Sequence, residues 1–236
     1  MDVVVGVPVT ERSVLKLVRL LWGLAESYDS IALPLPSSLC LEAVTASSRV
    51  LDIALKYMNR AQVRVWSSLL LELPRLAEAL PDLAVSCYLP DNFYEHSEEV
   101  GYKIAALVVK AKVFNKVDVK EWMELFRQPS KYKVDVGNTR VLVADGYSWT
   151  VRAYREYGAK ELKVAERLIP TPLDLLELTA YGYLEPENTE EIIKYAVRYV
   201  GEYVTLSKSL TEAYDKLVED EGYRELLEKL KIKILE

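Results

Sequence analysis

The residues whose types and spacing could do chemistry lie in the segment VLVADGYSWTVRAYREYG, from Val141 to Gly158. Its pattern predicts a strand, a turn at Asp145-Gly146 and then a helix. A helix that follows a strand in this way presents unpaired backbone N–H groups and the positive end of its dipole, which favour an anion. We therefore expect Asp145, Ser148 and Arg152 to bind a phosphate-bearing ligand. Asp145 would hold a hydroxyl group, a metal or a reacting proton, and Arg152 would supply bidentate charge.

The same segment has a purely structural interpretation. Asp145 would then only close the turn, and Ser148 would only cap the helix. The segment also lacks the further glycines of a dinucleotide fingerprint and the Gly-Lys-Ser/Thr of a phosphate-binding loop. The sequence therefore predicts a ligand site here without naming a catalytic residue or a cofactor.

Other polar residues follow the expected ends of neighbouring strands. In a parallel sheet these ends meet at one edge, where ligands bind in α/β proteins. Arg12 is the fourth ligand-binding candidate for this reason. The full set expected to converge on one cleft at this edge is Thr10, Arg12, Ser37, Ser38, Asp91 and Asn92.

Strands and helices alternate through most of the chain. The opening DVVVGVPV predicts a buried strand, and later β-branched or apolar runs predict others. These further strands are expected at 30–35, 62–66, 83–89, 139–144 and 162–169. Pro170-Thr171-Pro172 predicts a helix start, with Thr171 as N-cap and Asp174 three residues later. We predict an α/β fold with three layers, a mainly parallel Rossmann-like sheet and a C-terminal helical segment.

Two α/β units are expected, an N-terminal unit over 1–127 and a second unit over 138–236 that ends in helices. The polar segment Gln128–Asn138, with Pro129 and Gly137, is the linker candidate. One continuous domain with a single sheet across both units is the main alternative, and a β/α barrel is the next.

Metal and thiol chemistry have little support. His96 is the only histidine, and its context EHSEE lacks a paired-ligand spacing, so we expect a solvated side chain and no metal site. Cys40 and Cys87 lie in apolar runs and are expected to be buried small hydrophobic residues. A disulfide between them is the alternative, since some hyperthermophile intracellular proteins contain disulfides.

Composition limits the classes of partner and location. The net charge of −6 and the pI near 5.2 make nucleic acid an unlikely partner, because such binding relies on phosphate neutralisation. No long apolar run predicts a membrane span, and the N-terminus lacks the pattern of a signal peptide. We expect a cytoplasmic protein. Sixteen tyrosines and three methionines, with abundant charged residues, suggest a thermophilic source.

Two functions follow from these patterns. The leading hypothesis is binding of a phosphate-bearing small ligand, a nucleotide or a sugar phosphate, at the carboxyl ends of the strands. A transferase or a hydrolase would fit such a site, although the sequence leaves open whether the protein is an enzyme. The alternative is an interaction protein that forms a homodimer or binds a partner through acidic C-terminal helices. Tyr195, Tyr199, Tyr203 and Tyr214 would form that interface, unless they pack in the core.

Overall fold

Short runs of β-branched and apolar residues form the strands of the computed structural model, which describes residues 1–45, 49–127 and 137–236. The strands are β1 (Val3–Val7), β2 (Ser30–Pro36), β3 (Ala84–Leu89), β4 (Val141–Asp145) and β5 (Glu161–Val164). β1, β2 and β4 are buried along nearly their whole length. Such continuous burial is typical of strands that are covered on both faces.

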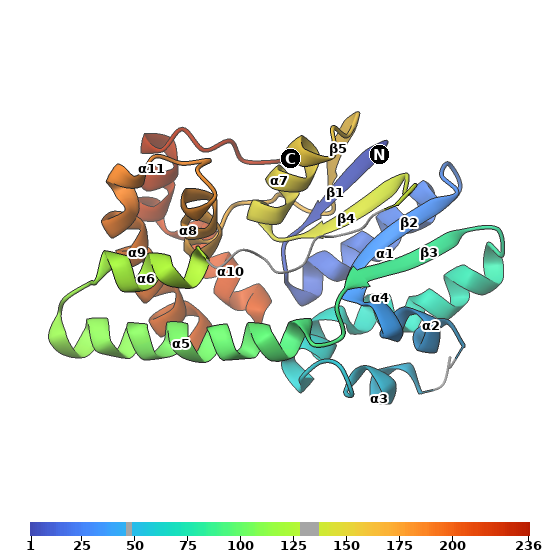
Figure 1. Ribbon diagram of the computed structural model, residues 1–236, viewed down its shortest axis with the longest axis horizontal. Coiled ribbons are helices and arrows are strands. Elements are labelled where there is room, and N and C mark those ends of the chain that lie inside the picture. The colour runs from blue at the N-terminus through green and yellow to red at the C-terminus, as the bar shows by residue number, and fades with distance from the viewer. Residues whose placement is uncertain (46–48, 128–136) are drawn as a thin grey trace. The chain divides into compact units, whose positions relative to one another are not determined.

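The five strands form one parallel sheet in the order β3-β2-β4-β1-β5 (Figure 1). β4 occupies the centre. It pairs with β1 from Val3↔Val141 to Val7↔Asp145, and with β2 at Ile31↔Val141. The parallel α/β prediction is therefore confirmed, and the carboxyl ends of all five strands lie at one edge of the sheet.

Helices cover both faces of this sheet. They are α1 (Glu11–Ala25), α2 (Ser37–Thr45), α3 (Val50–Ala54), α4 (Arg60–Ala79) and α7 (Tyr147–Glu156). The connections through α1 and through α2–α4 move along the sheet in one direction, and the connection through α7 moves in the other. Right-handed crossovers then place α7 on the opposite face from α1 and α4. Ala153 of α7 packs there against Val4, Leu142 and Ala144.

The other helices form a second compact unit from Glu98–Lys131 and Ile169–Leu235, whereas the sheet belongs to the unit of Met1–Ser97, Tyr132–Leu168 and Glu236. α5 (Phe93–Phe114) starts in the first unit and continues into the second. The remaining elements are α6 (Val119–Phe126), α8 (Pro172–Ala180), η1 (Pro186–Asn188), α9 (Thr189–Arg198), the π-helix η2 (Tyr199–Val204), α10 (Leu210–Glu219) and α11 (Glu221–Lys229). In the described residues, no helix combines the length and the apolar character needed to cross a bilayer.

The strand predicted at 62–66 is wrong, because these residues lie in α4. The segment QVRVW alternates like a strand, but Val63 and Trp66 also begin a buried helical stripe that continues to Leu76. A capping box starts the helix: Gln62 N donates to Asn59 Oδ1, and Asn59 N donates to Gln62 Oε1. Pro74 is accommodated inside this helix.

The predicted division into 1–127 and 138–236 stays a prediction about separate domains. Residues 128–136 of the linker candidate lie outside the described residues. The strands on either side of it share one sheet, as the single-sheet alternative proposed.

Candidate functional site

The turn between β4 and α7 lies at the carboxyl edge of the sheet and contains two of the predicted site residues. Asp145 is the last residue of β4, and Ser148 is a buried residue in the first turn of α7. The N-cap of α7 is Gly146, with φ 76°, and this residue makes no side-chain capping hydrogen bond. Ser148 is therefore not the N-cap that the structural interpretation required. Gly146 N donates to Val7 O at 2.9 Å, which ties the turn to the end of β1.

Two tyrosine hydroxyls lie near Asp145. Tyr88 Oη donates to Val143 O at 2.8 Å and accepts a hydrogen bond from Trp149 Nε1 at 3.0 Å. Burial, with the negative charge of Asp145 as the next cause, raises the pKa of Tyr88 and of Tyr94 well above its usual value. Both phenols therefore stay protonated beside the carboxylate. Sequence reasoning missed these tyrosines, because nothing in their spacing marks them.

Arg152 lies in the second turn of α7, seven residues after Asp145. Its side chain is only 9% exposed, and its Nε contacts Glu156 Oε1 at 3.3 Å. Its guanidinium carbon lies 5.4 Å from the centroid of the Trp149 ring. Glu156 is the last residue of α7, so this contact runs along the helix toward its C-terminal end.

Arg12 belongs to a second cluster at the same edge, on the first turns of α1. Glu166, which follows β5, is the centre of this cluster. It accepts hydrogen bonds from Ser13 Oγ at 2.6 Å and from Lys16 Nζ at 2.6 Å, and its Oε1 lies 2.9 Å from Arg12 Nε. Thr10 caps the helix by accepting from Ser13 N. A carboxylate of the chain itself therefore lies beside the first turns of this helix, where the dipole favours negative charge.

Glu166 should make the stability of the protein depend on pH. Burial alone would raise its pKa, but the hydrogen bonds from Lys16, Ser13 and Arg12 outweigh burial and hold that pKa below its usual value. Glu166→Gln should lower the free energy of unfolding by about 1–2 kcal/mol at pH 7, as loss of hydrogen bonds to a charged group does. A carboxylate with a lowered folded pKa stabilises above its unfolded pKa of about 4.3, and this contribution is lost as the pH falls through the folded value.

Urea unfolding of the wild type and Glu166→Gln at pH 7, 4 and 3 measures this effect. The difference between them should shrink toward pH 3. Glu161→Gln is the control, since Glu161 is 52% exposed in its ion pair with Lys163 and its loss should change stability by less than about 0.5 kcal/mol. A difference for Glu166→Gln that stays constant with pH would contradict the role of this carboxylate.

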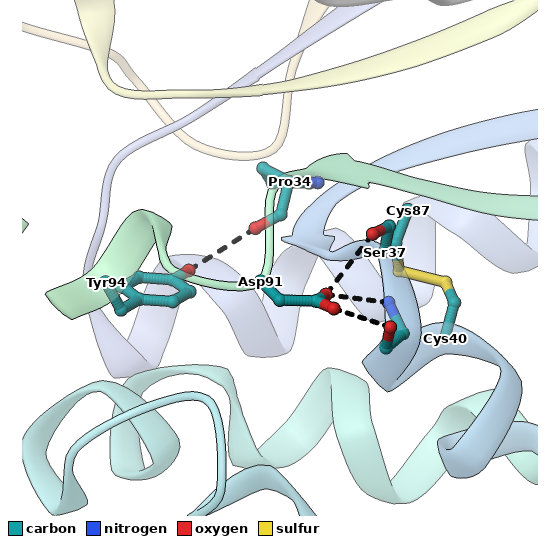
Figure 2. Close-up of a disulfide and its surroundings, with 7 residues drawn as sticks. Pro34, Ser37, Cys40, Cys87, Asp91 and Tyr94 are labelled. Atoms are coloured by element: carbon teal, nitrogen blue, oxygen red, sulfur yellow. Dashed lines mark hydrogen bonds between the residues drawn. A yellow bond between two sulfur atoms is a disulfide. The ribbon is translucent and has the colours of Figure 1, made fainter. Parts of the chain in front are cut away.

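A third cluster lies where β2 meets α2, and it too contains a carboxylate (Figure 2). Asp91 accepts hydrogen bonds from Ser38 N at 2.9 Å, Ser38 Oγ at 2.6 Å and Ser37 Oγ at 3.2 Å. The Ser38 hydroxyl is the largest cause of the lowered pKa of Asp91. The structure thus brings Ser37, Ser38 and Asp91 together as predicted, and Thr10 and Arg12 gather separately around Glu166. Whether they line one cleft stays a prediction.

A disulfide lies beside this cluster. Cys40 of α2 and Cys87 of β3 are bonded, with their Cα atoms 5.6 Å apart (Figure 2). The expectation of two free cysteines is therefore wrong, and the alternative holds. The cysteines are 47 residues apart in the sequence, so no short motif predicts that they pair. The bond fastens the start of α2 to the strand that precedes Asp91.

The described chain also places His96 and tests the expectation about metal ligands. His96 is half-buried in the first turns of α5, so it is less exposed than a solvated side chain would be. Among residues 1–45, 49–127 and 137–236, no group of three or more His, Cys, Asp and Glu is arranged to hold a metal ion.

Comparisons of the chain with protein-family models, with curated proteins and with solved structures find no match. The geometry described above is therefore the basis for any assignment of function.

Proposed function

We propose that the protein binds a small phosphate-bearing ligand, a nucleotide or a sugar phosphate, at the carboxyl edge beside the β4–α7 turn. The supporting observation is the contrast among three helix starts at this edge. Carboxylates of the chain itself accept the hydrogen bonds at α1 and α2, whereas α7 starts at a glycine with no side-chain cap. The N-cap residue of α7 thus supplies no side-chain acceptor for the backbone N–H groups of the first turn, and such groups favour an anion.

Asp145 and Ser148 have complementary roles in this proposal. The phosphate would lie against the backbone N–H groups and the hydroxyl of Ser148 in the first turn of α7. Asp145 would accept a hydrogen bond from a ribose or sugar hydroxyl. The protonated Tyr88 and Tyr94 keep the surroundings of Asp145 free of a second negative charge.

Arg12 and Arg152 have a smaller part than the sequence suggested. Each guanidinium contacts a carboxylate of the chain, Glu166 in one case and Glu156 in the other. Their roles as ligand residues stay predictions, and no residue is assigned a catalytic step.

A thermal-shift screen tests the proposal. Inorganic phosphate, nucleotides and sugar phosphates are added to the purified protein. A true ligand at a hundredfold excess over its dissociation constant should stabilise the folded state by about 2.7 kcal/mol. Asp145→Asn and Ser148→Ala should each raise the apparent dissociation constant of the ligand at least about tenfold, because each removes one good polar contact. The stabilisation by a given ligand concentration should fall accordingly.

Asp91→Asn is the matched control, because Asp91 is also a carboxylate at this edge but belongs to the α2 cluster. It should leave the ligand response unchanged. A flat screen with all three ligand classes would overturn the proposal. If Asp91→Asn and Asp145→Asn lose the ligand-induced stabilisation equally, the ligand does not bind specifically at the β4–α7 turn.

The alternative function relied on the tyrosines of the C-terminal helices as an interface. Tyr199 and Tyr214 are buried, and Tyr195 and Tyr203 are partly buried against the same core. Tyr214 Oη binds the backbone of Ile169, and Tyr203 Oη donates to Asp220. These side chains pack inside the unit, as the other interpretation of the tyrosines expected. Homodimerisation itself stays a prediction.

The cytoplasmic location and the thermophilic source also stay predictions. Disulfides are rare in intracellular proteins, but those of hyperthermophiles often contain them. The Cys40–Cys87 disulfide is therefore compatible with a cytoplasmic protein from a thermophile.

A further inference from the structure

The outer face of α5 carries a continuous apolar stripe. Tyr102, Ala106, Val109 and Val113 are spaced by four, three and four residues, which places them on one side of a helix. Tyr102 is 69% exposed, Val109 61% and Val113 68%, and Ala106 is also exposed. Single exposed apolar residues are ordinary, but a row of them at this spacing is typical of a helix that packs against a second helix.

The opposite side of the same helix is already used. Ile104, Leu107 and Val108 are buried in the core of the second unit, with Trp122 among their neighbours in that core. Leu107 and Val108 lie between Ala106 and Val109 in the sequence but on the opposite side of the helix. The helix therefore has two apolar faces. The inner face explains the fold of this unit, whereas the stripe contributes nothing to its core.

The charges beside the stripe change sign along the helix. Glu98 and Glu99 lie before it, and Lys110 and Lys112 lie near its other end. On a helical projection, Glu99 and Lys110 lie on one side of the stripe, and Glu98 and Lys112 lie on the other. Lys110 pairs with Glu121, and Lys112 with Glu202, yet their side chains keep 50% and 42% of their exposure. Each ammonium group can therefore meet a second carboxylate.

We propose that this stripe is a homodimer interface in which α5 packs antiparallel against α5 of a second copy. A twofold axis near Ala105 would place Tyr102 against Val109 of the other copy. The same register sets Glu99 against Lys110 and Glu98 against Lys112, each pair formed twice. A twofold interface must be self-complementary, and these four charges are self-complementary only when the helices are antiparallel.

The dimer should be weak. A single helix pair buries less than the roughly 1,200–2,000 Å² of a standard stable interface. The charge pairs lie at its rim, where each contributes little energy but sets orientation. We expect a dissociation constant on the order of 10 µM, which corresponds to about 7 kcal/mol.

Sedimentation velocity over a concentration series tests the interface. The wild type should move from a 26.9 kDa monomer toward a species of twice that mass. Val109→Asp should raise the dissociation constant more than about tenfold, because it places a charge in the apolar stripe. Leu206→Asp is the matched control, since Leu206 is 71% exposed but lies outside α5. A wild type that stays monomeric, or an equal loss in both variants, would overturn the proposal.

Charge exchange tests the antiparallel register. Glu99→Lys alone and Lys110→Glu alone should each weaken the dimer, because each creates two like-charge pairs across the axis. An equimolar mixture of these two variants should form a heterodimer of wild-type affinity, since every pair then has opposite charges. Circular dichroism checks that both variants are folded. If the mixture associates no better than the separate variants, the antiparallel pairing is wrong.

Discussion

Removal of the Cys40–Cys87 disulfide should lower the free energy of unfolding by about 4 kcal/mol, the value that chain entropy assigns to a closed loop of this length. The cysteines are separated by 47 residues, and the bond joins α2 to β3. The unfolded chain without the bond gains the conformations that the closed loop excludes. The double variant Cys40→Ala/Cys87→Ala, compared with the wild type by urea unfolding, measures the difference.

The reductant response gives the control. The wild type should lose a similar amount of stability when a thiol reductant is added, and the double variant should not respond to it. The sheet should survive in both, because β2 and β3 remain paired through backbone hydrogen bonds. Equal unfolding midpoints for the oxidised wild type and the double variant would contradict a stabilising role.

Gly6→Val should be the most damaging single substitution in the sheet. Gly6 lies in β1 between β4 and β5. A Cβ atom there would lie 2.7 Å from Thr150 Cγ2, 2.8 Å from Leu168 Cδ2 and 2.9 Å from Thr150 Oγ1. Thr150 is fully buried and donates to Gly146 O at 2.6 Å, so it cannot move without disturbing the start of α7. We expect a loss of about 3 kcal/mol, the upper range for overpacking.

Gly23→Ala is the matched glycine substitution. Gly23 lies inside α1, and a Cβ atom there would have nothing within 4 Å. This variant should raise the free energy of unfolding by about 0.5–1 kcal/mol, because alanine favours a helix over glycine. Chemical denaturation of both variants gives the two values. A Gly6→Val protein as stable as the wild type would show that Thr150 of α7 does not pack as closely against Gly6 as described.

The parallel sheet was predictable from the sequence because its strands are short apolar runs bounded by Gly and Pro. The start of α8 was also predictable, since Thr171 and Asp174 form the capping box that their spacing indicates. The segment 62–66 was not, because its alternation suits a strand as well as a helix. The apolar stripe that continues to Leu76 favours the helix, and so does the capping box between Asn59 and Gln62.

The positions of Asp145 and Ser37 at the ends of strands were predictable, but the contacts between residues far apart in the sequence were not. Strand ends identified Asp145 and Ser37, since topology alone brings strand ends to one edge. The pairing of Asp91 with α2 and of Glu166 with α1 depends on residues 53 and 153 positions apart in the chain. A local sequence pattern cannot predict contacts between residues so far apart in the chain. The pairing of Cys40 with Cys87 was not predictable for the same reason.

The order of strands in the sheet has a consequence for how the chain acquires its structure. In the part of the chain that the structure describes, β1 pairs with β4 and β5, and β4 separates β1 from β2. During synthesis, the opening strand therefore waits for residues 141–164 before it has a partner in the sheet. Contacts of such long sequence separation are formed late and slowly, because closing a long loop costs entropy before the contact is gained. Until then β1 is an apolar strand with two unpaired edges, and such edges favour aggregation.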